Sequence, residues 1–259
     1  MPPSFPCGEH QCFLFEESRD ALLPLILSRK SQLIAFGEAH KPADYQGDST
    51  VKIFTQQLLP TIAGGASHLL VELLQAPSSG CATEKKKAQK EAKKVTDGQA
   101  KSNQNEYLLL GHAALQQGIT PDILHASCQD MSAIAAPEGG VITMMETIQR
   151  LSEISLKSQL KSLKNGRPLV LAYGGALHND VEPHAGRETW SYGPSLLKHT
   201  NNSYLEIDLI VPELIGDTPG WKSFKWYEAY QELQHSQGAL LMKWGEHSYS
   251  LFFSPTKPN

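Results

Sequence analysis

The stretch Pro168–Asp180, PLVLAYGGALHND, decides the fold class. Its first six residues form a short apolar run, which predicts a strand buried on both faces. Two glycines then allow the chain to turn sharply off the strand, and a histidine, an asparagine and an aspartate follow. In open α/β sheets, ligands bind beyond the carboxyl ends of the strands. The stretch therefore predicts a central parallel strand with a polar site at its end.

Two other apolar runs lead into polar residues of the same kind. The run QLIAF continues into Glu38 and His40, and the run HLLVEL carries Glu72 one residue before its end. Parallel strands place their carboxyl ends on one edge of the sheet. We therefore expect these three residues to converge with His178 and Asp180, although they are far apart in the sequence.

Strand and helix patterns alternate along the rest of the chain. Helical periodicity covers residues 20–28, 51–62, 104–118 and 141–164. Further strands are expected around residues 11–15, 123–126, 204–211, 239–244 and 249–254. The last two flank a short Gly-Glu-His loop, as in a hairpin. The pattern predicts an α/β fold with a mixed, mostly parallel sheet flanked by helices and a C-terminal antiparallel hairpin, formed by residues 1–259 as a single domain.

Composition excludes several classes of protein. The 259 residues are 40% hydrophobic and 19% charged, which is typical of a globular chain and excludes a disordered or coiled-coil protein. The net charge of −4 does not indicate nucleic-acid binding. We expect no membrane span, since no run of about 18 apolar residues occurs. The N-terminus has no secretory-signal pattern, so we expect a cytoplasmic protein. Oligomeric state is not indicated.

The four cysteines are expected to be reduced thiols. Cys7, Cys12, Cys81 and Cys128 match no disulfide or zinc-ribbon spacing, and a cytosolic protein keeps its thiols reduced. A metal clip formed by Cys7, His10 and Cys12 is the less favoured alternative.

Residues 84–105 differ in composition from the rest of the chain. This segment has seven lysines against three acidic residues and almost no large apolar side chain. It cannot bury enough surface to fold alone, and it predicts a flexible insertion whose first half is compatible with a solvated helix. An arm for nucleic acid or an acidic partner is the less favoured interpretation. Without the segment the chain has 16 basic and 24 acidic residues, a net charge of −8.

The residues expected at the sheet edge support two kinds of chemistry. Imidazoles and carboxylates together hold a divalent metal, and His40, Glu72, His178 and Asp180 are the candidate ligands. Without a metal, a histidine oriented by a carboxylate is a general base that activates water. His125, near the end of another predicted strand, is a further candidate whose role stays open.

The turn Gly37–His40, the strand residues Val71-Glu72 and the turn Gly174–Asn179 resemble the ChaN-like, Tiki and erythromycin-esterase-like superfamily. The nearest branch is the ChaN-like haem-binding-uptake group, and the resemblance covers residues 32 to about 211 without the lysine-rich insertion. It implies a mixed α/β fold with the site on one sheet edge. Tiki-like members are described as metal-dependent proteases, esterase-like members hydrolyse a lactone with a histidine base, and ChaN is a haem-binding lipoprotein.

By position, the resemblance implies that His40 is the base or a metal ligand, with Glu38 and Glu72 as its partners and His178 as the second imidazole. The leading hypothesis is a hydrolase acting on a small molecule or peptide by metal-assisted water activation. The alternative is a haem- or iron-binding protein without turnover, for which Tyr173 and Trp190 are the candidate pocket residues. The absence of a lipoprotein signal departs from ChaN itself.

Overall fold

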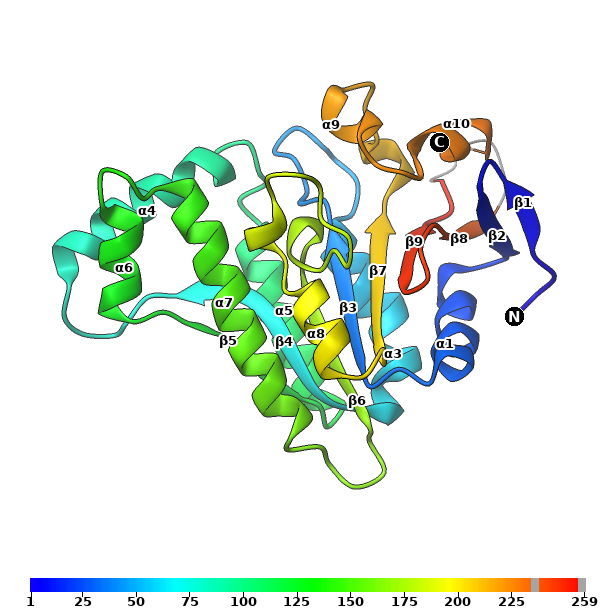
Figure 1. Cartoon of the computed structure of the whole chain (residues 1–259), viewed down its shortest axis with the longest axis horizontal. Coiled ribbons are helices and arrows are strands. Elements are labelled where there is room, and N and C mark those ends of the chain that lie inside the picture. Colours follow the sequence, from blue (N-terminus) through cyan, green and yellow to red (C-terminus); the bar gives the residue numbers. More distant parts are fainter. Residues whose placement is uncertain (234–237, 256–259) are drawn as a thin grey trace.

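A nine-stranded mixed sheet runs through the part of the chain that the computed structural model describes, residues 1–233 and 238–255 (Figure 1). The strand order is β1-β2-β8-β9-β7-β3-β6-β4-β5. The strands are β1 Phe5–Cys7, β2 His10–Phe15, β3 Leu33–Glu38, β4 Ala66–Gln75, β5 Thr120–His125, β6 Leu169–Gly175, β7 Tyr204–Ile210, β8 Ala239–Lys243 and β9 Ser248–Phe252. The six strands from β9 to β5 are parallel, whereas β1, β2 and β8 add antiparallel pairs. The predicted fold class, including the hairpin β8–β9, is confirmed.

Helices cover both faces of the sheet (Figure 1). On one face lie α1 Ser18–Arg29, α2 Thr50–Ile53, a π-helical turn Phe54–Leu58, α3 Leu59–Ile62 and α5 Asn103–Gln116. On the other lie α4 Ala82–Thr96, α6 Cys128–Ala135, α7 Val141–Leu160 and α8 Gly193–His199. The side chains of a strand alternate between these layers: on β3, Ile34 and Phe36 pack in the first core, and Leu33 and Ala35 in the second.

Shorter elements complete the chain. They are the 3-10 turns η2 Ala63–Gly65, η3 Ala176–His178, η4 Glu188–Trp190 and η5 Pro212–Leu214, and the helices α9 Pro219–Lys222 and α10 Tyr227–Leu233. A third core lies between α10 and the antiparallel strands, around the fully buried Trp226. None of the helices in the described ranges combines the length and apolar character needed to cross a membrane.

The expected helix over residues 51–62 is interrupted. The N–H of Leu59 donates to the carbonyl of Phe54, five residues back, and Pro60 has no N–H to continue the α-helical pattern. The turn directs Phe54 into the core, where its ring lies 4.8 Å from Phe36 and 4.7 Å from Tyr173 between centroids.

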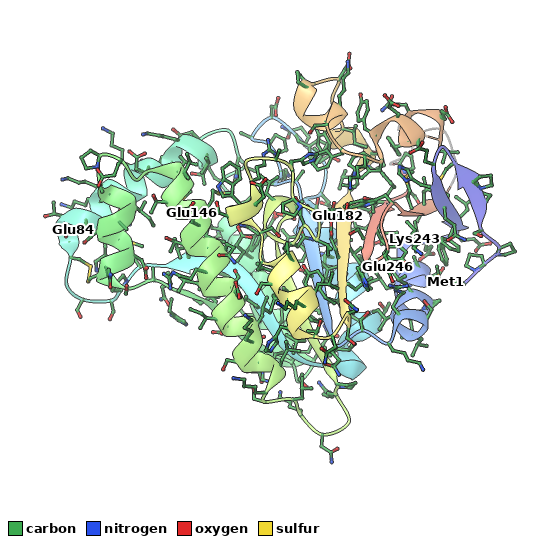
Figure 2. The ribbon with its side chains drawn as sticks, viewed as in Figure 1. Met1, Glu84, Glu146, Glu182, Lys243 and Glu246 are labelled. Carbon is green, nitrogen blue, oxygen red and sulfur yellow. A yellow bond between two sulfur atoms is a disulfide. The ribbon has the colours of Figure 1, made fainter. Side chains whose placement is uncertain are left out.

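The lysine-rich segment contains the helix α4, which packs on α6 through the buried Ala88. Figure 1 places these two helices at the opposite end of the molecule from β1 and β2, and Figure 2 marks the same ends by Glu84 and Met1. The segment after α4 returns to the sheet edge: the N–H of Ala43 donates to the carbonyl of Gly98, and the N–H of Ala100 to the carbonyl of Lys41. The insertion thus ends beside the residues that follow His40.

The prediction of reduced cysteines is wrong. Cys7 pairs with Cys12 across the β1–β2 hairpin, and Cys81 pairs with Cys128, with Cα separations of 5.9 and 5.6 Å. The second pair depends on the packing of α4 against α6, which residue spacing cannot reveal. The first pair also rules out the alternative of a clip with His10, because its thiols are consumed.

Candidate active site

The carboxyl ends of β3, β4 and β6 bring four of the predicted site residues together. Glu38 ends β3 and His40 follows it, Glu72 lies on β4, and His178 ends the turn η3 that follows β6. Glu38 is paired in register with Gly175, so the two Gly-rich turns lie side by side. The pairing of β4 with β5 shifts between Val71 and Leu74, so Glu72 lies at an irregularity of its strand.

Glu38 is a buried carboxylate whose two oxygens each accept a tyrosine hydroxyl. Tyr107 on α5 donates to Oε1 over 2.8 Å, and Tyr173 on β6 donates to Oε2 over 2.5 Å. Burial, followed by the charge of Glu38, raises the pKa of both phenols well above its usual range, so both stay protonated donors. The Glu38 side chain is only 2% exposed, and these donors replace the water that an ionised carboxylate loses on burial.

His40 completes this arrangement and presents one nitrogen outward. Its Nδ1 lies 2.9 Å from Glu38 Oε1, and because a carboxylate only accepts, Nδ1 carries the hydrogen. The neutral ring therefore offers the lone pair of Nε2, on a side chain that is 30% exposed. Burial lowers the pKa of His40, but the hydrogen bond to Glu38 and the charges of Glu38 and Glu72 outweigh it, so the net shift is upward from 6.5.

Glu72 and His178 form the opposite side of the site. The N–H of Gly175 donates to Glu72 Oε2 over 2.9 Å, and His178 Nε2 lies 3.6 Å from Glu72 Oε1. His178 Nδ1 lies 2.7 Å from the carbonyl of Trp190, which can only accept, so Nδ1 again carries the hydrogen. Nε2 of a neutral His178 is then an acceptor facing a carboxylate. This pair is favourable only with a proton or a cation between the two atoms.

The glycines make this close approach feasible. A Cβ at Gly174 would overlap the Glu72 carboxylate, whereas a Cβ at Gly175 would lie 3.4 Å from His40 Nε2 and 3.9 Å from Glu72 Oε1. The Gly-Gly pair thus explains why the Glu72 carboxylate of β4 and the His40 imidazole after β3 can both lie against the backbone of β6.

Asp180 does not join the residues with which it was grouped. It lies with Glu206 and Asp208 of β7, and in the described chain this trio is the only group of three or more Asp, Glu, His or Cys residues whose ligand atoms all lie within 4.8 Å of one another. The predicted set of His40, Glu72, His178 and Asp180 is therefore not assembled as one group. The reason is local: the N–H of the next residue, Val181, donates to Glu206 and holds the chain against β7.

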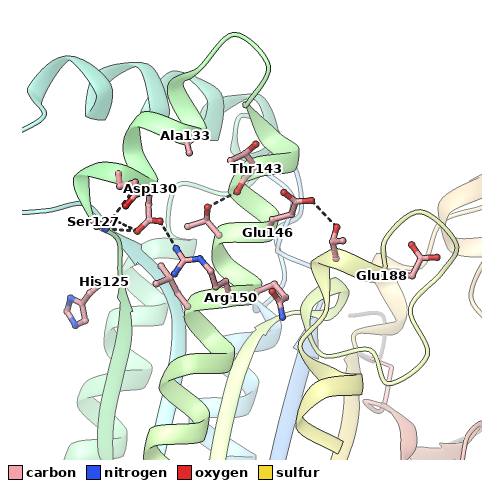
Figure 3. A pocket seen from close by; sticks show the side chains of 13 residues that line it. His125, Ser127, Asp130, Ala133, Thr143, Glu146, Arg150 and Glu188 are labelled. Atoms are coloured by element: carbon pink, nitrogen blue, oxygen red, sulfur yellow. Dashed lines mark hydrogen bonds and ion pairs between the residues drawn. The ribbon is translucent and has the colours of Figure 1, made fainter. Parts of the chain in front are cut away.

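The remaining candidates have other surroundings. The hydroxyl of Tyr173 is committed to Glu38, and the ring of Trp190 is half-buried, with the Arg187 guanidinium 5.8 Å from its centre. The side chain of His125 is 65% exposed and borders a separate surface hollow of about 830 Å³ between α6, α7 and η4. Figure 3 shows the Asp130–Arg150 ion pair in this hollow, with His125 at its margin.

Sequence reasoning missed Tyr107 and the acidic pair of β7. Tyr107 lies on a helix that was expected, but nothing in its periodicity indicates that its hydroxyl reaches Glu38. Glu206 and Asp208 did leave a signal, because two carboxylates alternate within the otherwise apolar strand YLEIDLI.

Fold and site together define an α/β protein with a histidine–glutamate site at the carboxyl edge of its sheet. No protein-family model matches the chain, and no curated protein matches it. Among solved structures, the type III effector HopBA1 aligns with a TM-score of 0.50 at 14% identity over 99% of this chain and 100% of that one. This likeness concerns the fold alone.

Two other solved structures are similar at a lower level. RRSP, a MARTX toxin effector domain from Vibrio vulnificus CMCP6, aligns with a TM-score of 0.34 at 17% identity, over 60% of this chain and 30% of that one. ChaN of Campylobacter jejuni, described with cofacial heme binding, aligns with a TM-score of 0.36 at 14% identity, over 78% and 92% of the two chains.

Proposed function

We propose that this chain is a hydrolase that activates water with His40 and acts on an ester, lactone or amide bond of a small molecule or peptide. The observation that carries the proposal is the Glu38–His40 pair. Both oxygens of Glu38 are held by tyrosine hydroxyls, and His40 Nδ1 is held by Glu38. The lone pair of Nε2 is thereby presented to the side of the site where Gly175 and Glu72 lie.

In this reaction His40 Nε2 takes a proton from water as the oxygen attacks the scissile carbonyl. Glu38 stabilises the imidazolium that forms, because the Nδ1–H already points at its carboxylate. A proton held between Glu72 and His178 would be donated to the leaving group, which takes the bonding electron pair. His40 then supplies a proton that restores the pair, so no net proton is gained or lost.

The same residues supply the donor types of a metal site, although the ligand atoms of His40, Glu72 and His178 do not all lie within 4.8 Å of one another. His40 Nε2, His178 Nε2 and a Glu72 oxygen are the ligand types of a catalytic two-histidine, one-carboxylate site. Both histidines have Nδ1 bonded to an acceptor, which is how metal-binding histidines are usually oriented. An ion bound there supplies positive charge for the developing oxyanion and makes water more acidic.

The test is a hydrolysis screen over p-nitrophenyl esters, lactones and peptides, with and without added Zn²⁺ or Mn²⁺. We expect His40→Ala and His178→Ala to lower the rate by about 10²–10⁴-fold. The matched control is His125→Ala, a histidine with an exposed side chain outside the site, which should keep the wild-type rate. Wild-type rates in both site variants would overturn the proposal.

Haem or iron binding without turnover is the alternative. The observation in its favour is the partly exposed His40, whose Nε2 is a nitrogen that iron can bind. Tyr173 is a poor candidate ligand, because its hydroxyl donates to Glu38. This alternative predicts a Soret band on adding hemin that is lost in His40→Ala and kept in Tyr173→Phe. The absence of any spectral change with the wild type would remove it.

A further inference from the structure

Three carboxylates are buried together on the opposite face of the sheet from Glu38. Asp180, Glu206 and Asp208 are 6%, 0% and 2% exposed, and their ligand oxygens all lie within 4.8 Å of one another. Glu206 and Asp208 pair in register with Ala35 and Gly37, so they share the face of those two residues. Glu38 lies one position further along β3 and points to the other layer, towards Tyr107 of α5. The trio is therefore a different group from the Glu38–His40 pair, although Asp180 lies two residues after His178.

The three carboxylates lack ion-pair partners within the described ranges of the chain. The charges of Arg187 and Lys225 act on Asp180 from a distance. Lys225 forms its ion pair with Glu182, and the Arg187 guanidinium lies over the Trp190 ring. A buried anion without compensation is costly.

One oxygen of the trio lacks a hydrogen-bond partner within the described part of the chain. Glu206 Oε2 accepts the N–H of Val181 and the hydroxyl of Ser248, each over 2.8 Å. Glu206 Oε1 is sealed from solvent and accepts no hydrogen bond from any residue that the structure describes. A buried polar atom in a native protein nearly always has a partner, so this oxygen indicates a missing proton or cation.

Either protons or a cation can compensate the group. Burial raises the pKa of Asp180 to about 7 and the pKa of Glu206 and Asp208 well above the usual range. The donors of the trio are all oxygens, which are the ligands that hard divalent cations prefer.

We propose that Asp180, Glu206 and Asp208 bind a hard divalent cation, of the Mg²⁺, Mn²⁺ or Ca²⁺ class. The cation would join β7 to the segment 176–191, which carries His178. The hydroxyl of Tyr204 on β7 already donates to the carbonyl of Asn179 in this segment, and within the segment the hydroxyl of Ser191 donates to the carbonyl of Asp180. The site therefore has a positioning role: it fixes the strand-end segment from which His178 faces Glu72.

The experiment uses the full-length chain, stripped with EDTA and then titrated with MnCl₂, MgCl₂ or CaCl₂. The readouts are Tm and, for Mn²⁺, the metal retained per chain after gel filtration. Wild type should gain Tm with at least one of the three ions and retain one ion per chain. Glu206→Gln and Asp208→Asn should lose both effects, while remaining folded without metal because they remove repulsion. Glu182→Gln, an exposed carboxylate nearby, is the matched control and should behave as wild type.

His40→Ala and His178→Ala separate this site from the proposed catalytic one, and both should keep the Tm gain. A wild type whose Tm and metal content do not respond to any of the ions at millimolar concentration overturns the proposal, whether or not the variants fold. A response kept in Asp208→Asn and lost in His40→Ala assigns the ion to the histidines. That result overturns the acidic site and leaves the proposed hydrolase standing.

Discussion

Substitution of Gly175 by alanine is expected to separate the function of the site from the stability of the fold. Gly175 has φ −67° and ψ 137°, which alanine adopts without strain. The new methyl carbon would lie 3.4 Å from His40 Nε2 and 3.9 Å from Glu72 Oε1, both ordinary van der Waals separations. The backbone N–H that donates to Glu72 is kept. The fold therefore accepts the change, but the space in front of Nε2 is filled.

Gly175→Ala is expected to raise the stability of the fold and to lower the rate of hydrolysis. A glycine-to-alanine change in a compatible conformation raises the free energy of unfolding by about 0.4–1 kcal/mol, since the unfolded chain loses freedom. A water that bonds to Nε2 needs its oxygen at about 2.7–3.0 Å, and a methyl group at 3.4 Å excludes it from that position. Losing the base is worth about 10²–10⁴ in rate, so hydrolysis should fall by that factor while the urea midpoint stays level or rises.

Diethyl pyrocarbonate gives an assay that needs no substrate. It modifies accessible, unprotonated imidazole nitrogens, and peptide mass spectrometry reads each histidine separately. His40 should react more slowly in Gly175→Ala than in wild type, while the exposed His125 in the same sample serves as internal reference. Gly64→Ala, at a glycine whose Cβ would meet nothing within 4 Å, is the matched control and should leave both rates unchanged. An unchanged His40 rate in Gly175→Ala would refute the assignment of Nε2 as the nitrogen facing this space.

Three further predictions address the disulfides, His40 and Tyr173. Cys81 and Cys128 close a loop with a sequence separation of 47, and replacing both by serine should lower the free energy of unfolding by about 4 kcal/mol, measured with urea. For Cys7 and Cys12, with a separation of 5, the expected loss is about 2 kcal/mol. Equal losses would contradict the loop-length argument. In EDTA, the NMR-observed pKa of His40 should lie above 6.5 and fall in Glu38→Gln. Activity should then rise as the pH increases through that pKa, because a general base must be unprotonated. The contribution of His40 to the free energy of unfolding should be complete below pH 6.5 and be lost as the pH rises through the raised pKa. Tyr173→Phe removes the donor to Glu38 Oε2 and should lower the free energy of unfolding by about 1–3 kcal/mol, measured by urea unfolding; no loss would mean that water replaces the hydroxyl.

The central strands were predictable because their signal is local. Buried parallel strands read as apolar runs, and β3, β4, β6 and β7 all do so. The convergence of Glu38, His40, Glu72 and His178 then follows from topology, since parallel strands share a carboxyl edge. Asp180 failed this reasoning because two residues after His178 the chain has already turned against β7. A strand-end rule gives the edge of the sheet and not the direction of each side chain.

The Cys81–Cys128 disulfide and the contact of Tyr107 with Glu38 could not be predicted for a different reason. Each depends on how two helices lie relative to other elements: α4 against α6 for Cys81 and Cys128, and α5 against the sheet for Tyr107. Periodicity reveals that a helix exists and which face is apolar, but not which hydroxyl or thiol its packing brings to a distant partner.

The lysine-rich insertion, residues 84–105, connects the helix α4 to the residues around the candidate site. Its C-terminal part bonds to the backbone of Lys41 and Ala43, directly after His40, and then continues into α5, which supplies Tyr107 to Glu38. A charge-rich segment that cannot fold alone is therefore fixed at one end by the Cys81–Cys128 disulfide and at the other by the turn that carries the proposed base. Because the body of the chain has a net charge of −8 and the insertion one of +4, an anionic substrate would be drawn to the insertion rather than to the body. The insertion thus ends beside the turn that carries the proposed base, His40.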